Sequence, residues 1–248
     1  MRLGRVLAVT AAAALGVRLV RAKKTRFLHP DGRSFDGDLE VWGTGEPTGA
    51  ALIDHPGRHP VTVRISKGVG TAPGRRDVLG FALRVHGPVA GRQCDLLFST
   101  AGRGRWRRHL PALRRSFDTG YGTILPYRTG TGTKLYLSAG ADPRGVPLGR
   151  TLETVTHAAA EGAHVLLGAA RGGDPVRIYG RVRFGDLRPA RVDAGLAFDP
   201  IRNAPPDLHP TGAVHGLRAA AYRLSQQWRG AQPTAPNPAA VARTAGHR

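Results

Sequence analysis

Short runs of alternating apolar and polar residues recur along most of this chain. Glycine, proline or aspartate bounds each run, and the 248 residues include 34 Gly and 19 Pro. Successive side chains of a β-strand point to opposite faces of a sheet, so an alternation of period two predicts strands with one buried face. Frequent turn residues favour an antiparallel sheet or barrel over long helices. The predicted strands are residues 38–42, 61–66, 81–85, 95–99, 134–137 and 176–184.

Two segments carry helical spacing instead. Residues 148–160 have apolar positions at helical intervals, and residues 213–228 follow a Pro-Thr-Gly entry and end before Gly230. A glycine just past the last turn is a common helix stop. Strands followed by a C-terminal helix describe the α+β class, with an antiparallel barrel as the main body.

We expect three parts in the chain: an N-terminal apolar and basic segment over residues 1–22, one barrel domain over residues 23–230, and a disordered Pro/Ala-rich tail over residues 231–248. Arg18 interrupts the apolar part of the first segment, which is short for a membrane span. A packed or frayed helix, an export signal or membrane anchor, and an unstructured segment all stay open. A cytoplasmic location is expected, with membrane association or export through residues 1–22 as the alternative.

The chain is strongly basic, with 37 Lys and Arg against 17 Asp and Glu and a formal net charge of +20. Such a charge is compatible with nucleic acid, anionic lipid or an acidic ligand. The arginines are scattered, and their clusters lack the interleaved aromatic residues of a base-stacking surface. We therefore expect no specific nucleic-acid partner and keep polyanion binding as an alternative. Cys94 is the only cysteine, which excludes an intrachain disulfide or a multi-cysteine metal site.

The predicted C-terminal helix carries a tyrosine between two arginines on one narrow stripe. Arg218, Tyr222 and Arg229 are spaced i, i+4 and i+11, which places them within about 40° of one another around a helix. Nearby cations favour the ionised phenol, and a phenolate is a suitable ligand for ferric haem iron. The spacing alone is more typical of an ordinary amphipathic helix surface.

Two upstream segments add groups of matching chemistry. In the predicted strand 61–66, Arg64 and Ser66 point to the same face, and Arg26 precedes His29 by three residues in a Gly/Asp-rich segment. Guanidinium groups suit the two propionates of a haem, with tyrosinate on one face of the ring and imidazole on the other. Taken singly, a loop histidine is usually solvated.

Four landmarks in sequence order resemble the haem catalases, over roughly residues 26 to 229. RFLHPDGRSFDGDLEV is similar to the catalase segment that carries the essential histidine. VTVRISKGVG, then RRDVLGFALRV and CDLL, look like three successive catalase strands. AFDPIRNAPPDLHPTG leading into RAAAYRLSQQWR is similar to the Phe-Asp-Pro segment and the helix of the iron ligand. The resemblance implies a catalase-type antiparallel β-barrel with a C-terminal haem-ligand helix.

The resemblance also implies roles for individual residues. Tyr222 would bind the iron of haem b, and His29 would be the catalytic histidine on the opposite face, oriented by Ser66. Four arginines would bind the haem: Arg26, Arg64, Arg218 and Arg229. Of these, Arg26 and Arg64 would hold the propionates. His29 would take a proton from a peroxide and return it to the leaving oxygen, which is general acid–base catalysis.

Two departures from the catalase pattern limit what the resemblance implies. Catalases carry an asparagine just beyond the Asp-Leu strand that assists the histidine, whereas this chain reads DLLFST, with Ser99 or Thr100 near that place. Fast dismutation of hydrogen peroxide is therefore in doubt, and organic hydroperoxides become candidate substrates. The chain is also shorter than a full catalase, so we expect the C-terminal helical domain and the tetrameric assembly not to carry over.

Two functions follow as expectations. The first is a haem-dependent peroxidase or weak catalase that reduces hydrogen peroxide or organic hydroperoxides with an unknown reductant. The second is a non-catalytic haem or anionic-lipid binding barrel that has lost peroxide chemistry.

Overall fold

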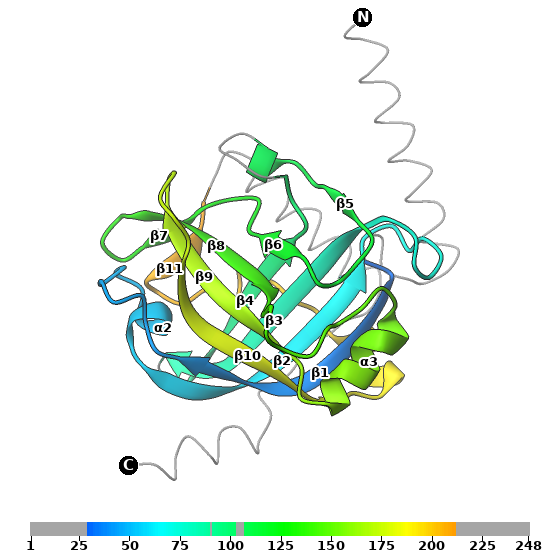
Figure 1. Cartoon of the computed structure of the whole chain (residues 1–248). Helices are drawn as coiled ribbons and strands as arrows, with labels where there is room; N and C mark the ends of the chain where they lie inside the picture. The colour runs from blue at the N-terminus through cyan, green and yellow to red at the C-terminus, as the bar shows by residue number, and fades with distance from the viewer. Residues whose placement is uncertain (1–28, 90, 103–106, 212–248) are drawn as a thin grey trace, which may run out of the picture.

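The structure, a computed structural model, describes residues 29–89, 91–102 and 107–211. Their main feature is a closed antiparallel barrel of eight strands, in the order β8, β6, β4, β3, β2, β1, β10 and β9 (Figure 1). Pairing of β9 with β8, from Leu135 opposite Arg171 to Ala141 opposite Val165, closes the ring. The barrel strands are β1 (Asp31–Val41), β2 (Gly57–Lys67), β3 (Asp77–Val89), β4 (Arg92–Ser99), β6 (Gly120–Gly122), β8 (Lys134–Ala141), β9 (His164–Arg171) and β10 (Arg177–Leu187).

Three short strands extend the sheet of the barrel. β7 (Tyr127–Thr129) pairs with β8, and β11 (Leu208–Pro210) pairs with β7, which ties the end of the described chain to the barrel. β5 (Leu113–Arg114) pairs with the start of β3. The strands from β1 to β11 thus belong to one continuous sheet.

The interior of the barrel holds the hydrophobic core. Every second residue of the long strands points inward and is buried, among them Phe35, Val63, Leu83, Leu96 and Val182. Burying an aliphatic or aromatic side chain of this size contributes about 1.5–3 kcal/mol each, so the alternating pattern supplies the main stabilisation. The Phe35 ring meets the ring of Phe184 edge-on across β1 and β10, at 5.4 Å between centroids.

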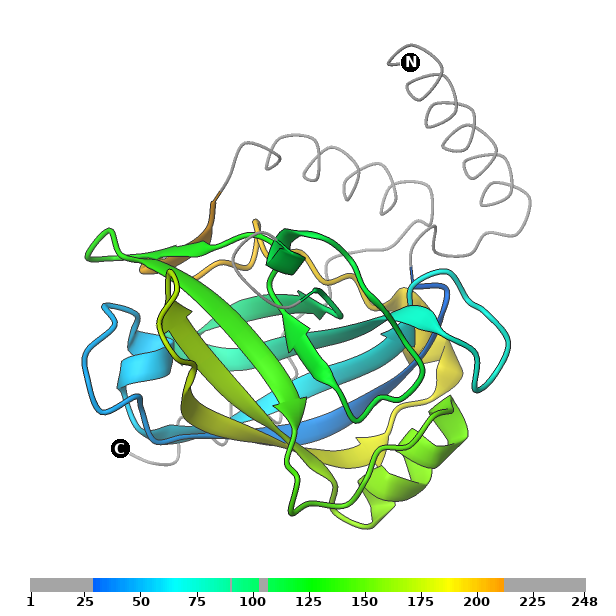
Figure 2. The ribbon, with the colours of Figure 1, turned by 45° about the horizontal axis from the view of Figure 1, so that its top comes forward.

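The helices among the described residues are short, and they lie outside the barrel strands. α2 (Ala51–Asp54) and α3 (Leu152–Ala160) lie at opposite ends of the barrel (Figures 1 and 2). α4 (Ala190–Gly195) follows β10 and contacts β1, and a 3₁₀ turn covers Arg107–His109. From α4 the chain runs along the far side of the wall formed by β2, β3 and β4 (Figure 2), where the backbone of Asn203 accepts a hydrogen bond from Asp95 N.

The sequence pattern predicted most of this architecture. All six predicted strands are present, each within or overlapping a longer strand. The predicted helix 148–160 begins later, at Leu152, because Thr151 and Thr154 form a capping box and Gly149 takes a positive φ of 79°. β9, β7, β5, β6 and β11 were missed, since His164–Arg171 lacks clear alternation and the others have three residues or fewer. The predicted helix 213–228 lies outside the described residues.

Other sequence predictions lie partly beyond the described chain. The segments 1–22 and 231–248 are outside it, so the three-part division stays a prediction. No helix among the described residues is long and apolar enough to cross a membrane.

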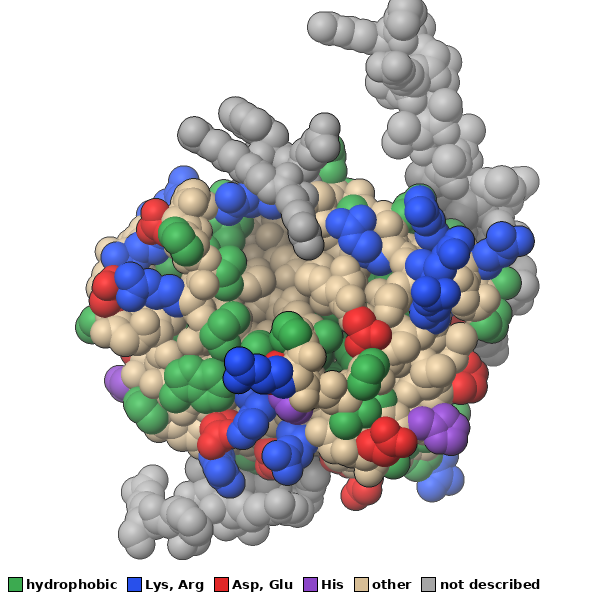
Figure 3. All heavy atoms as spheres, in the orientation of Figure 1, with side chains coloured by type: hydrophobic (Ala, Val, Ile, Leu, Met, Phe, Trp, Pro, Cys, Tyr) green, Lys and Arg blue, Asp and Glu red, His purple; other side chains and the backbone are tan. Residues whose placement is uncertain are grey.

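On the face in Figure 3, Lys and Arg side chains form several separate groups with Asp and Glu between them. The buried position of Cys94, which is 1% exposed, raises the pKa of its thiol well above the usual value.

Candidate functional site

The outer face of β2, β3 and β4 carries a polar stripe that the hydrophobic core does not use. Residues paired directly across an antiparallel sheet point to the same face. Ser66 pairs with Gly80, Arg64 with Ala82, and Thr62 with Arg84. Their β4 neighbours are Ser99, Leu97 and Asp95 respectively. The stripe therefore consists of three successive rows across the wall, each with polar residues on it.

His29 lies over the first of these rows. The Oγ atom of Ser66 is 2.9 Å from Nδ1 of His29, and the backbone N–H of His29 donates to the carbonyl of Gly68 at 2.9 Å. His29 has a positive φ of 58°, which is uncommon for a residue with a side chain. Backbone conformations of this kind occur preferentially at functional sites. The structure thus brings together the two residues that the sequence predicted as the catalytic pair.

Gly80 provides the space for the histidine ring. A Cβ at Gly80 would lie 2.5 Å from Cε1 of His29, 2.6 Å from its Nδ1 and 2.8 Å from Oγ of Ser66. Real Cβ atoms do not approach other atoms this closely, so a side chain here would displace the imidazole. Close approach to another group is one of the physical reasons for glycine inside a strand.

Arg64 is buried and already ion-paired. Its Nε donates to Oδ1 of Asp193 at 2.8 Å and its Nη2 donates to Oδ2 at 3.4 Å, and the side chain is only 4% exposed. Ser34 of β1 also donates to Asp193 Oδ1, at 2.5 Å. Gly32 makes room for the guanidinium, because a Cβ there would lie 2.5 Å from Cζ of Arg64. The predicted propionate arginine is therefore on the predicted face but is neutralised by α4.

A second buried ion pair continues the stripe. Nε and Nη2 of Arg84 donate to the two carboxylate oxygens of Asp95, both at 2.7 Å, and the side chains are 2% and 0% exposed. Asp95 also accepts from the backbone N of Asp199 at 2.7 Å and from Nδ2 of Asn203 at 2.8 Å. The chain after α4 is thereby fixed to the barrel wall.

His86 ends the stripe on β3, where its Nε2 lies 2.9 Å from the hydroxyl of Thr62. Burial lowers the pKa of His86 to about 4, and the charge of Arg84 adds to this effect. Among the described residues, Nδ1 of His86 and Nη1 of Arg84 are buried without a hydrogen-bond partner. The sequence did not predict the Arg84–Asp95 and Thr62–His86 contacts. The one local signal for them is that Arg84 and Asp95 lie directly opposite each other on β3 and β4.

The remaining predicted site residues lie outside the described chain. These are Arg26, before β1, and three residues of the predicted C-terminal helix: Arg218, Tyr222 and Arg229. Within the described residues no group of three or more His, Cys, Asp or Glu side chains is arranged to hold a metal ion. The roles of the four residues stay predictions.

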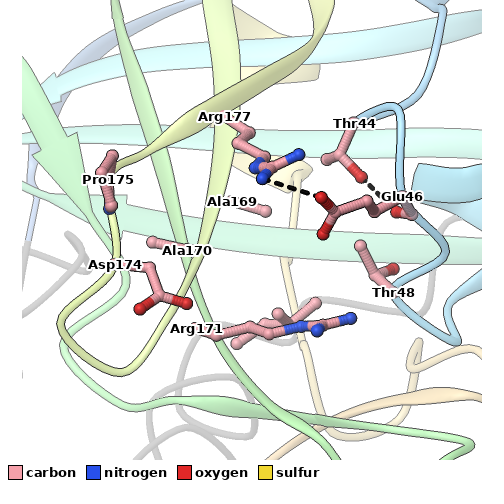
Figure 4. Close-up of a pocket in the computed structure, with 10 residues that line it drawn as sticks. Thr44, Glu46, Thr48, Ala169, Ala170, Arg171, Asp174, Pro175 and Arg177 are labelled. Carbon is pink, nitrogen blue, oxygen red and sulfur yellow. Dashed lines mark hydrogen bonds and ion pairs between the residues drawn. The ribbon is translucent and has the colours of Figure 1, made fainter.

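A pocket of about 260 Å³ lies elsewhere, between the β9–β10 hairpin and the chain before α2 (Figure 4). Arg177 and Glu46 face each other across it, with Nη2 of the arginine 2.9 Å from Oε1 of the glutamate. Arg171 donates to the backbone carbonyl of Pro47 at 2.8 Å. The pocket lacks all of the predicted site residues, so it is separate from the polar stripe.

Comparison with known proteins identifies the fold. No protein-family model matches the chain, and no curated protein matches it. Among solved structures, a fungal catalase is similar with a TM-score of 0.64 and 14% identity over 83% of this chain, and a bacterial catalase with 0.61 and 14% over 88%. The match covers 59% and 60% of those two chains, so the likeness extends over less than two thirds of their length. The chain therefore has a catalase-like barrel fold.

Proposed function

We propose that this protein is a haem-dependent peroxidase or weak catalase that acts on hydrogen peroxide or organic hydroperoxides. The observation that carries the proposal is the pairing of His29 Nδ1 with Ser66 Oγ at 2.9 Å, over Gly80 on the outer face of the barrel. The catalase-like fold supports it, and so does the order of the sequence landmarks.

The described residues fit one face of a haem. The imidazole is held by a buried hydroxyl, and Gly80 and Gly32 leave room for the His29 ring and the Arg64 guanidinium to lie against the wall. Ala82 and Leu97, half-buried, provide apolar surface beside the histidine. In the proposal Tyr222 binds the iron with Arg218 and Arg229 flanking its phenolate, and Arg26 holds a propionate.

Arg64 has a different part in this proposal from the one the sequence implied. Asp193 holds its guanidinium in two hydrogen bonds, so its charge is compensated within the protein. A propionate would compete with a carboxylate already in place. We therefore assign Arg64 mainly to fixing α4 against the wall, which leaves Arg26 as the propionate-binding arginine that the resemblance implies.

The chemistry divides between the haem and the chain. When bound, the haem supplies the redox centre at which the O–O bond breaks. The peroxide ROOH gains two electrons and two protons and leaves as ROH and water. The electrons come from two one-electron donors of phenolic type or, in dismutation, from a second hydrogen peroxide that is oxidised to dioxygen.

His29 moves the proton in this scheme. In the tautomer with Nδ1–H donating to Ser66 Oγ, Nε2 would carry the lone pair that takes the proton of the peroxide and returns it to the leaving oxygen. Ser66 holds the orientation of the ring, because its side chain is buried on β2 and its Oγ lies 2.9 Å from Nδ1. Positioned acid–base groups of this kind contribute about 10²–10⁴-fold to a rate.

Steady-state turnover of haem-loaded protein tests the proposal. Cumene hydroperoxide and hydrogen peroxide are compared, with an aromatic one-electron donor present, in the wild type and in His29→Gln. We expect kcat/KM in the variant to fall by about 10²-fold or more at unchanged haem content. His209→Gln, an exposed histidine of β11, is the control and should leave turnover unchanged. Wild-type turnover that does not depend on His29 would refute the assignment.

The formal net charge of +20 favours a second candidate, a non-catalytic barrel that binds haem or anionic lipid. The Arg64–Asp193 pair lowers the positive charge of the polar stripe itself, so this binding would rely on the other arginines. Haem-loaded wild type without turnover of either peroxide would support the haem-binding form. Failure to bind haem, together with binding to vesicles that contain phosphatidylserine, would support the lipid-binding form.

A further inference from the structure

We propose that one end of the barrel docks on a membrane surface that contains anionic phospholipid. The docking surface consists of the β2–β3 loop, residues 68–76, and the segment of residues 110–115, which contains β5. We call it the basic–apolar surface. The inference goes beyond the proposed function, because it concerns where the protein binds rather than its reaction. It holds with or without bound haem.

Large aliphatic side chains project into solvent from both segments. Val69 is 71% exposed, Leu110 is 62% exposed and Leu113 is 57% exposed. Seven large apolar side chains are exposed among the residues that the structure describes, so nearly half of them lie on this one surface. A single exposed aliphatic residue is normal in a soluble protein, whereas several together indicate a surface that binds an apolar partner.

Backbone pairing brings the two segments side by side. The N–H of Gly68 donates to the carbonyl of Val78 at 2.6 Å, and Val78 in turn pairs with Leu113 of β5. Val69, next to the glycine, therefore lies within about two strand spacings, roughly 10 Å, of Leu113. Leu110 precedes Leu113 by three residues on the same segment. The three aliphatic side chains thus form one patch.

Four arginines lie beside this patch: Arg75 and Arg76 at the end of the loop, and Arg114 and Arg115 at the end of β5. Asp77 pairs with Arg114 in an antiparallel register, so Arg76 and Arg115 follow that pair on the two chains. None of the four arginines belongs to an ion pair within the described chain. The Lys and Arg group at the upper right of Figure 3 lies over this loop and the segment around β5. Neighbouring like charges repel, and an anionic partner would relieve the repulsion.

Acidic residues do not balance these charges. The two segments contain no Asp or Glu, and Asp77, which follows the loop, is fully buried. Its carboxylate accepts from the backbone N–H groups of Val69 and Thr71 and from the hydroxyl of Thr71. Asp77 therefore holds the loop in place from within. Asp31 lies beside Gly70, at the edge of the surface. The basic–apolar surface is positive overall, which complements an anionic partner.

The combination of arginines with exposed aliphatic side chains favours a lipid surface over a soluble polyanion. Guanidinium groups bind phosphate oxygens in pairs of hydrogen bonds, which suits phospholipid headgroups. Aliphatic side chains on the same surface gain free energy when they enter the boundary between headgroups and acyl chains. A surface that binds single-stranded nucleic acid uses aromatic side chains for stacking, and the two segments contain no aromatic residue.

Sedimentation of the full chain with phosphatidylcholine vesicles, prepared with and without phosphatidylserine, tests the proposal. We expect the wild type to bind only the vesicles that contain phosphatidylserine. The double variant Leu110→Ser, Leu113→Ser should bind them about tenfold or more weakly, because it removes the inserting groups. The double variant Arg76→Gln, Arg115→Gln should also bind about tenfold or more weakly, because it removes two charges at the surface.

Matched controls change the same residue types elsewhere. Val176→Ser with Ile178→Ser removes exposed apolar groups of the β9–β10 hairpin, where the arginine between them is already ion-paired. Arg92→Gln with Arg202→Gln removes two exposed charges, one at the start of β4 and one after α4. Both controls should leave vesicle binding unchanged. Thermal melting checks that every variant is folded.

A fluorescent probe reports insertion directly. Leu113→Cys, labelled with an environment-sensitive dye, should show stronger and blue-shifted emission when vesicles with phosphatidylserine are added. Val176→Cys, labelled in the same way at the opposite end of the barrel, should show no change. Cys94 is 1% exposed, so it does not compete for the dye in the folded protein.

Three results would overturn the inference. They are a wild type that does not bind anionic vesicles, vesicle binding that the leucine variant keeps in full, and a probe at position 113 that stays in water. Equal loss of vesicle and DNA binding in the arginine variant, with no effect of the leucine variant, would indicate a polyanion site instead. None of these measurements requires haem or turnover, so failure of the proposed function is recognised separately.

Discussion

Gly80 fixes the place of the His29 ring at the scale of single residues, because the ring occupies the position that a Cβ would take. We predict that Gly80→Ala displaces the imidazole, weakens its bond to Ser66, and lowers peroxide turnover by about 10²-fold. The protein should still fold, because the atoms that the added Cβ would meet belong to the side chains of His29 and Ser66. Gly120→Ala is the control, because a Cβ there meets no atom within 4 Å. Equal turnover in the two variants would remove His29 from the mechanism.

His86 supplies a prediction about pH. Its pKa is lowered to about 4 by burial and by Arg84, against 6.5 in the unfolded chain. The unfolded state therefore binds more protons between pH 4 and 6.5, so the free energy of unfolding rises with pH across that window and stays constant above it as far as His86 is concerned. We expect His86 to raise the free energy of unfolding by about 2 kcal/mol between these two pH values, after allowing for its partial exposure.

Chemical denaturation at several pH values measures this gain. His86→Gln should lose the dependence between pH 4 and 6.5 that His86 contributes, while the remaining groups titrate as in the wild type. Asp54 and Asp77, whose pKa values are lowered by hydrogen bonds from backbone N–H groups, act mainly below this window and are present in both proteins. Identical pH profiles for the variant and the wild type would show that His86 is not held neutral.

At the scale of elements, the Arg84–Asp95 pair links β3, β4 and the chain after α4. Removing one partner of a buried ion pair leaves an uncompensated charge, which costs about 3–5 kcal/mol. We predict that Asp95→Asn lowers the free energy of unfolding by roughly this amount. Glu46→Gln breaks an exposed pair with Arg177 and should cost less than about 1 kcal/mol. Similar denaturation midpoints for the two variants would contradict the structural role of Asp95.

The sequence predicted the elements better than the contacts between them. Alternation identified β2 and β3 because both have one face in the core, and it correctly placed Arg64 and Ser66 on the same side. It missed Asp193 as the partner of Arg64, since the two residues are 129 positions apart and a six-residue helix brings them together. Long-range pairing of this kind follows from barrel closure, which no local pattern contains.

For the whole molecule, the closed barrel separates two functions of the same strands. Inward side chains form the core, and outward side chains of β2, β3 and β4 form the polar stripe with His29 above it. The catalase-like fold was predicted from landmarks in the correct order, and the barrel bears out that fold. The iron ligand, Tyr222, lies outside the described residues, so it stays a prediction of the sequence.

The most direct test is the absorption spectrum of protein expressed with ample haem precursor, recorded for the wild type, Tyr222→Phe and Tyr136→Phe. Tyr136 is a half-buried residue of β8 and serves as the control. We predict a ferric haem spectrum of tyrosinate type in the wild type and in Tyr136→Phe, and its loss in Tyr222→Phe. Absence of bound haem from the wild type, or an unchanged spectrum in Tyr222→Phe, would contradict the account.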